Sequence, residues 1–181
     1  MPARSIVLAT AVLAAAPASA SITVIGGTSA RLCYEAADSP LAPSPETFAA
    51  CDRALLAERL IARDVVATHV NRGILRVRTG DLVGGIEDFD AAIALDPNVG
   101  EAWFNRGAAL LRSSRPAEAL SSFEAAVALG IDRPALAHLG RGVAHEALGD
   151  ARAAYADYRR ASELDPGWAR PRAELARFSV R

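Results

Sequence analysis

The sequence contains no lysine, and all 20 of its basic side chains are arginines. Aspartate and glutamate together number 21 among 181 residues, so the formal net charge is −1. Such a balanced chain lacks the basic excess with which proteins hold nucleic-acid phosphates, and we expect no nucleic-acid partner. Alanine is abundant instead, and because it costs least in a helix, the composition favours a helical protein. The length suits a single domain.

No apolar run is long enough to cross a bilayer, which takes about 20 residues. The longest such run, 6–16, follows the positive charge of Arg4 and precedes the small residues 18–20, Ala-Ser-Ala. This order is typical of a secretory signal peptide and its cleavage site. We therefore predict a signal peptide over 1–20 and a mature chain that starts near Ser21, in the periplasm or outside the cell, without stable membrane insertion. An uncleaved anchor is the alternative.

Cysteine is also rare, and Cys33 and Cys51 are the two in the sequence. An exported chain meets an oxidising environment in which cysteines form disulfides. We therefore predict one bridge between these two residues. Two free, buried thiols remain the alternative.

Repetition is what the sequence has in abundance. The triplet Asn-Arg-Gly occurs at 71–73 and again at 105–107, and the stretches 69–97, 103–131 and 138–166 align with one another. Three columns recur at steps of 34 and 35 residues: glycines (Gly73, Gly107, Gly142), aromatic residues (Phe89, Phe123, Tyr158) and alanines (Ala92, Ala126, Ala161). A fixed period of this length predicts a stacked array of similar units.

Each unit is predicted to be a pair of helices. The expected ends of the first helices are Gly80, Ser113 and Gly149, and the expected starts of the second helices are Asp81, Pro116 and Asp150. Glycine is typical of a helix end, and aspartate or proline of a helix start. Glycine inside a helix costs about 1 kcal/mol relative to alanine. The glycine column therefore predicts close contact between the paired helices, with the aromatic column filling the seam.

This pattern resembles the tetratricopeptide repeat family. The middle unit carries Trp103, Gly107, Ala119 and Phe123 at that family's spacing, and the other units keep most of these columns. The resemblance implies an all-α fold, a right-handed α-solenoid of stacked antiparallel helix pairs.

The expected divisions of the chain follow from this resemblance. They are a flexible mature N-terminus (21–28), a degenerate leading helical pair (29–65, its second helix over 46–63), three repeats (66–99, 100–134 and 135–168), and a capping helix with the tail (169–181). The leading pair is inferred because residues 51–57 repeat the pattern of 89–95. A polar capping helix is what the end of a stacked array requires.

Two arginines stand 16 residues before an aspartate, Arg72 before Asp88 and Arg141 before Asp157. In a helix hairpin this spacing can bring the two side chains together. We therefore expect two ion pairs that brace the hairpins, each worth about 0–1 kcal/mol if exposed. The alternative is a row of arginines that binds an anion.

In this family the first helices line a concave groove, so the resemblance implies a surface there for another protein or a peptide. The groove positions expected here are apolar (Val70, Ile74, Val77, Phe104, Ala108, Leu111, Leu139, Val143) or polar edges (Asn71, Arg78, Asn105, Arg112). Phe104 is the largest of them and the expected anchor. The alternative is that part of this stripe packs between repeats. Without lysine, the clamp with which some members grip C-terminal carboxylates is absent in its usual form.

No catalytic set is visible in the sequence. His145-Glu146 lacks the second histidine of a zinc-protease motif, and no nucleophile elbow occurs. His69 and His138 are expected to pack at helix starts. We therefore expect neither enzymatic activity nor a cofactor or metal. The expected function is an exported scaffold for protein interaction, and the alternative is a structural module that assembles with copies of itself.

Overall fold

The computed structural model describes residues 20–178, so the expected signal peptide lies outside the described residues except for Ala20. Every regular element in this range is an α-helix. The helices are α1 (Thr28–Asp38), α2 (Pro45–Ala57), α3 (Ala62–Arg78), α4 (Leu82–Leu95), α5 (Gly100–Arg112), α6 (Pro116–Leu129), α7 (Pro134–Ala147), α8 (Ala151–Leu164) and α9 (Ala169–Arg177). None of them is long and apolar enough to cross a membrane.

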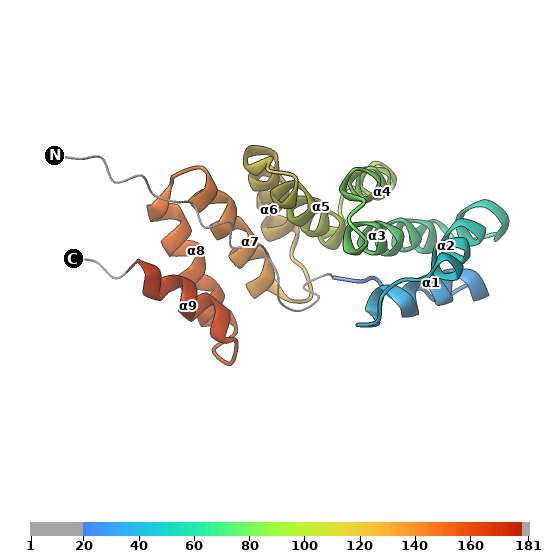
Figure 1. The fold of residues 1–181 in the computed structure, drawn as a ribbon, viewed down its shortest axis with the longest axis horizontal. Helices are drawn as coiled ribbons and strands as arrows, with labels where there is room; N and C mark the ends of the chain where they lie inside the picture. Colours follow the sequence, from blue (N-terminus) through green and yellow to red (C-terminus); the bar gives the residue numbers. More distant parts are fainter. Residues whose placement is uncertain (1–19, 179–181) are drawn as a thin grey trace.

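The helices form antiparallel pairs that stack in a row, as the repeat predicts (Figure 1). Each second helix packs between its own first helix and the first helix of the next pair. The first helices also contact one another, α1 with α3, α3 with α5, and α5 with α7. A row of helices that touch lies on the inner side of a curved stack. We call the side formed by α1, α3, α5 and α7 the inner face.

Helix starts in the repeats follow the predicted caps. The Asp81 carboxylate accepts a hydrogen bond from the Gly84 amide at 2.9 Å, and Asp150 accepts one from the Ala153 amide at 2.9 Å. These bonds satisfy amides that have no partner within the helix. Pro116 is the first residue of α6, where its missing amide hydrogen costs nothing.

The turns between paired helices contain one residue in the left-handed region. Gly80 has a φ of 93° and Gly149 a φ of 86°, which glycine adopts without steric cost. The middle repeat has no glycine there, and Ser114 takes the same conformation with a φ of 57°. The residue that replaces the glycine is therefore Ser114, one position beyond the predicted Ser113.

The leading pair is shorter than predicted. α2 ends at Ala57 rather than continuing to residue 63, and α3 begins at Ala62, inside the stretch assigned to the leading pair. Glu58 leaves the helix in an extended conformation, and its carboxylate accepts hydrogen bonds from the amides of Ser29 and Ala30. Two unpaired amides at the start of α1 are satisfied by this contact, so the break between α2 and α3 has a structural role.

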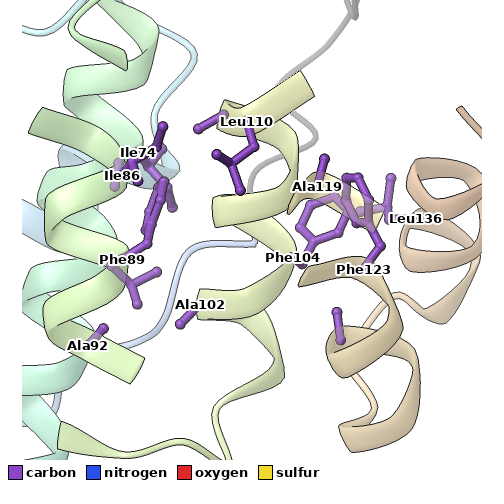
Figure 2. Packing of buried hydrophobic residues seen from close by; sticks show 14 of the residues in the cluster. Ile74, Ile86, Phe89, Ala92, Ala102, Phe104, Leu110, Ala119, Phe123 and Leu136 are labelled. Atoms are coloured by element: carbon purple, nitrogen blue, oxygen red, sulfur yellow. The ribbon is translucent and has the colours of Figure 1, made fainter. Parts of the chain in front are cut away.

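The seam inside each pair is where the glycine and aromatic columns meet, as predicted. A Cβ on Gly73 would lie 2.6 Å from the Phe89 ring, and one on Gly142 would lie 2.7 Å from the Tyr158 ring. Figure 2 shows Phe89 beside Ile74 and Ile86 in the first of these seams. These distances leave no room for a side chain, which explains why glycine occurs inside the first helices.

Both ends of the stack are closed. Cys33 of α1 and Cys51 of α2 form a disulfide with a Cα–Cα distance of 4.9 Å, so the predicted bridge is confirmed. At the other end α9 packs on α8, and the Phe178 ring that follows it lies 5.8 Å from the ring of the buried Tyr158. The apolar seam of the last repeat is covered by this contact.

Candidate interaction face

The apolar stripe expected in a groove is core in the described chain. Val70, Ile74, Phe104 and Leu139 are buried, and Val77, Ala108, Leu111 and Val143 are half-buried. Phe104 is only 2% exposed and its ring lies 5.8 Å from that of Phe123 (Figure 2). The expectation that Phe104 is an exposed anchor is therefore wrong: with the segment before α1 in place, the ring is buried and packs against Phe123 of its own repeat. Val70, Ile74 and Phe104 belong to one apolar cluster that extends across the repeats, whereas Leu139 packs within the third repeat.

Part of this stripe is covered by the chain itself. The segment before α1 (blue in Figure 1) runs across the inner face, and its Ala20 and Ile22 pack against the cluster that contains Phe104 and Val70. This stretch was expected to be a flexible N-terminus over 21–28. That expectation is wrong on two counts, since α1 begins at Thr28 and the residues before it make specific hydrogen bonds.

Two asparagines of the inner face hold this segment by its backbone. The Asn71 side chain donates to the carbonyl of Ile22 at 2.8 Å and accepts from its amide at 3.0 Å. Asn105, one repeat further on, donates to the carbonyl of Ala20 at 3.1 Å and accepts from its amide at 3.4 Å. Each side-chain amide therefore pairs with both backbone groups of one residue, as a neighbouring β-strand would. These asparagines were predicted to lie on the inner face as polar edges.

Asp64 anchors the other end of the segment. Its carboxylate accepts hydrogen bonds from the amides of Ile25 at 3.2 Å and Gly26 at 2.8 Å, and the residue is only 1% exposed. Sequence reasoning missed this residue because the first repeat was expected to begin at 66. The signal that could have found it is an acidic residue in the first turn of a helix, next to an apolar stretch.

Arg78 and Arg112, expected as polar edges of a groove, join successive repeats. Arg112 donates to the carbonyl of Val77 at the end of α3, at 2.8 Å. Arg78 donates in the same way to the carbonyls of Ala36 and Ala37 at the end of α1. Helix ends present unpaired carbonyls and partial negative charge, so each arginine caps the first helix of the preceding pair.

The predicted arginine–aspartate pairs are confirmed. Arg72 makes a bidentate contact with Asp88, its Nη2 lying 2.7 Å from Oδ1, and Arg141 makes one with Asp157 at 2.8 Å. In the middle repeat Arg106 binds Ser122 and Asp90 instead. These pairs are less exposed than expected, because both Asp88 and Asp157 are buried.

A histidine completes each of the two buried clusters. The Nδ1 of His69 lies 3.0 Å from Asp88, and that of His138 lies 2.9 Å from Asp157. Burial alone would raise the pKa of Asp88, but hydrogen bonds from His69 and Arg72 outweigh it and hold that pKa below its usual range. The same balance, with His138 and Arg141, lowers the pKa of Asp157. Both clusters brace the paired helices. Their arginines already donate hydrogen bonds to an aspartate, which argues against a row of arginines that binds an anion.

The described part of the chain contains no group of three or more histidine, cysteine, aspartate or glutamate side chains placed to hold a metal ion. The inner face offers three kinds of contact. Asparagine side chains pair with backbone groups, the buried Asp64 carboxylate accepts hydrogen bonds from backbone amides, and apolar side chains lie between them. These groups hold an extended polypeptide.

Comparison with known proteins bears on the same region. The family model described as "Tetratricopeptide repeat" matches residues 70–134 and 109–167, which together span more than half of the 181 residues. The chain belongs to the tetratricopeptide repeat family. A DnaJ homolog subfamily C member 7 homolog of Schizosaccharomyces pombe is 37% identical over 115 residues. That match covers 61% of this chain but only 24% of the relative, so the chain spans about a quarter of its length.

Solved tetratricopeptide repeat structures share the fold. The first such domain of Spaghetti (RPAP3), bound to the HSP90 peptide SRMEEVD, is 28% identical with a TM-score of 0.60 and covers 63% of this chain and 90% of its own. The second domain of human RPAP3, in complex with the HSP70 peptide SGPTIEEVD, is 26% identical with a TM-score of 0.58, covering 62% and 93%. MamA from Desulfovibrio magneticus RS-1, at 23% identity and a TM-score of 0.67, covers 82% of each chain.

Proposed function

We propose that this protein is an exported tetratricopeptide repeat scaffold whose inner face binds an extended segment of another protein. The observation that carries the proposal is the pairing of Asn71 and Asn105 with the backbone of residues 22 and 20. These contacts bind the backbone of an extended chain and not its side chains. A preformed stack also loses little conformational entropy when it binds such a chain. Two structural relatives bound to peptides, both RPAP3 domains, support a peptide partner.

Selection of random heptapeptides displayed on phage tests the binding activity. The protein and its Asn71→Ala/Asn105→Ala variant are panned in parallel, and we expect enriched peptides that bind the first and not the second. Asn98→Ala, on an exposed turn, is the matched control for loss of an asparagine. Enrichment that is equal for all three proteins would mean that partners dock elsewhere. No enrichment, either with these proteins or with an Ile22→Asp/Val24→Asp variant whose inner face is uncovered, would argue against peptide binding.

Export is the second part of the proposal. The order of charge, apolar run and small residues at the N-terminus supports it, and a disulfide between Cys33 and Cys51 suits an oxidising compartment. Intact-mass measurement of protein expressed in a bacterium tests this, and we expect a chain that begins at Ser21, in which cleavage has removed Ala20 and left the Asn105 side chain open to a partner. Ala18→Asp/Ala20→Asp should block cleavage. A wild-type chain that retains residues 1–20 would contradict the proposal.

A further inference from the structure

The segment before α1 presents alternate side chains to the inner face. Ile22 is half-buried and Val24 is buried, whereas Thr23 is exposed and Ile25 is 72% exposed. Ala20 and Ile22 pack against the main core cluster, and Val24 packs against alanines of α1, α2 and α3. This alternation is that of a β-strand with one face covered. The inner face thus receives a small residue followed by two aliphatic residues at every second position.

The backbone contacts have the same period. Asn71 and Asn105 lie one repeat apart, and the residues that they hold, Ile22 and Ala20, lie two apart. An extended chain places such residues roughly 7 Å apart, close to the separation of about 8–10 Å between packed helices. Successive repeats can therefore read successive inward-facing residues of one extended chain, and the segment runs from the second repeat towards the first.

Both ends of the site are defined by residues of the stack. Gly140 stands at the position of the third repeat that matches Asn71 and Asn105, so α7 has no side chain with which to read a further residue. At the other end, a Cβ on Gly26 would lie 3.0 Å from the Asp64 carboxylate that binds its amide. A residue larger than glycine would crowd this contact. The site therefore takes about seven residues and ends on a small one.

We infer that residues 21–26, which remain after the proposed cleavage, are a built-in ligand that a partner must displace, that cleavage vacates the Asn105 site held by Ala20, and that the partner segment repeats the pattern of residues 20–26. That pattern is a small residue, two aliphatic residues at the next two alternate positions, and glycine two residues later. The inference rests on the proposed function, because it names the occupant of the same face. Asn71 and Asn105 are uncharged and the nearby arginines are engaged, so the pattern requires no acidic residue.

A labelled peptide with the sequence of residues 20–26, ASITVIG, tests the inference by fluorescence anisotropy. Wild-type protein should bind it weakly because the site is occupied, since occupancy lowers apparent affinity by the fraction of free sites. Ile22→Asp/Val24→Asp should release the segment and lower the apparent Kd at least tenfold. Thr23→Asp/Ile25→Asp adds the same charge at outward positions and should bind as weakly as wild type. Gly26→Val is a second way to release the segment if the double variant loses helicity.

The released variant also identifies the residues that read the peptide. Adding Asn105→Ala to it should weaken peptide binding at least tenfold, whereas adding Asn98→Ala should not. The acidic peptide SRMEEVD should fail to compete at concentrations where unlabelled ASITVIG does. Hydrogen exchange of the Ile22 amide should be slow in the wild type and fast in the released variant.

The outcomes separate this inference from the proposed function. Equal peptide binding by wild-type and released protein would overturn self-occupancy. A released variant that ignores ASITVIG, or that prefers SRMEEVD, would overturn the pattern. In either case, random peptides that still require Asn71 and Asn105 would keep the proposed function standing. Failure of both ASITVIG and the random selection would overturn the two together.

Discussion

At Asp88, three basic side chains converge on one carboxylate that is 2% exposed. His69 and Arg72 lie 3.0 Å and 2.7 Å from its oxygens, and Arg76 lies 2.9 Å away. A buried charge is tolerated only when it is paired, and removing one partner leaves the others uncompensated. The two helices of the first repeat are therefore locked together at a single residue.

Acid should weaken this lock. The pKa of Asp88 is lowered in the folded state, so the unfolded chain binds more protons as the pH falls below about 5. The contribution of Asp88 is present above the unfolded pKa and is lost as the pH falls through the folded one. We expect Asp88→Asn to cost about 3 kcal/mol at pH 7 and to flatten the acid side of the stability curve. Urea unfolding between pH 3 and pH 7 measures both effects.

Asp90→Asn is the matched control for that experiment. Asp90 also pairs with an arginine, Arg106, but its side chain is 51% exposed. Exposed pairs contribute about 0–1 kcal/mol, so this variant should follow the wild-type curve closely. Equal losses for the two variants would show that burial does not set the strength of the brace.

Ser114 carries a backbone cost that its counterparts Gly80 and Gly149 avoid. In the left-handed region, a residue with a side chain costs about 1–2 kcal/mol more than glycine. Part of glycine's advantage is offset, because unfolded glycine has more conformational entropy to lose on folding. We therefore expect Ser114→Gly to raise the free energy of unfolding by about 0.5–1 kcal/mol, measured by urea denaturation. Ser113→Gly should lower it instead, because Ser113 has a φ of −86° and binds the Ala109 carbonyl. No gain at Ser114 would mean that the turn is not strained.

At the scale of the helix, close approach decides which residues are allowed. Phe123 is enclosed by glycines of two helices, since a Cβ on Gly107 would lie 3.0 Å from its ring and one on Gly140 would lie 2.5 Å away. Gly107 belongs to the same repeat as Phe123, and Gly140 to the next. The ring therefore sets the spacing both within a pair and between pairs.

Gly140→Ala should push α7 away from α6. Overpacking of a filled core costs about 1–3 kcal/mol, so we expect a loss in that range in thermal or urea unfolding. Gly167→Ala is the control, because a Cβ there would lie 3.5 Å from its nearest neighbour, an ordinary contact. A Gly140→Ala variant as stable as the control would mean that the helices can separate without cost.

The sequence predicts elements that recur and misses contacts that occur once. Gly73 opposite Phe89 follows from columns seen three times, and the Arg72–Asp88 pair follows from spacing within a hairpin. The bond from Asn71 to Ile22 joins a repeat to a segment outside the repeats, so no sequence period predicts it. The burial of Phe104 depends on helix rotation, which a pattern of apolar residues fixes only roughly.

At the scale of the molecule, the apolar interior is divided. One cluster runs from α1 to α7, and a smaller one holds Leu139, Ala154 and Tyr158 under α9. The first end of the stack has a disulfide that closes a loop of 18 residues, worth about 3 kcal/mol in the chain-entropy model. The other end relies on α9 and Phe178. Stacked repeats unfold in neighbouring units, so the two ends need not open together.

We expect the C-terminal end to open first. Hydrogen exchange followed by mass spectrometry should show faster exchange in α8 and α9 than in α3 to α6, at pH 7 and without denaturant. Reduction of the disulfide should speed exchange in α1 and α2 while leaving α8 and α9 unchanged. Uniform exchange along the chain would instead indicate a single cooperative unit.

The arginines that cap the preceding first helix give assembly of the stack a direction. The carbonyls at the end of α3 gain their hydrogen-bond donor only when Arg112 has been made, and those at the end of α1 only when Arg78 has been made. A polypeptide emerges from the ribosome N-terminus first, so each pair is completed only when its successor appears. Ile22 is made before the helix that binds it, and its backbone must stay unpaired until Asn71 has been synthesised. The segment before α1 therefore takes its place only after α3 has been made, although it comes first in the chain.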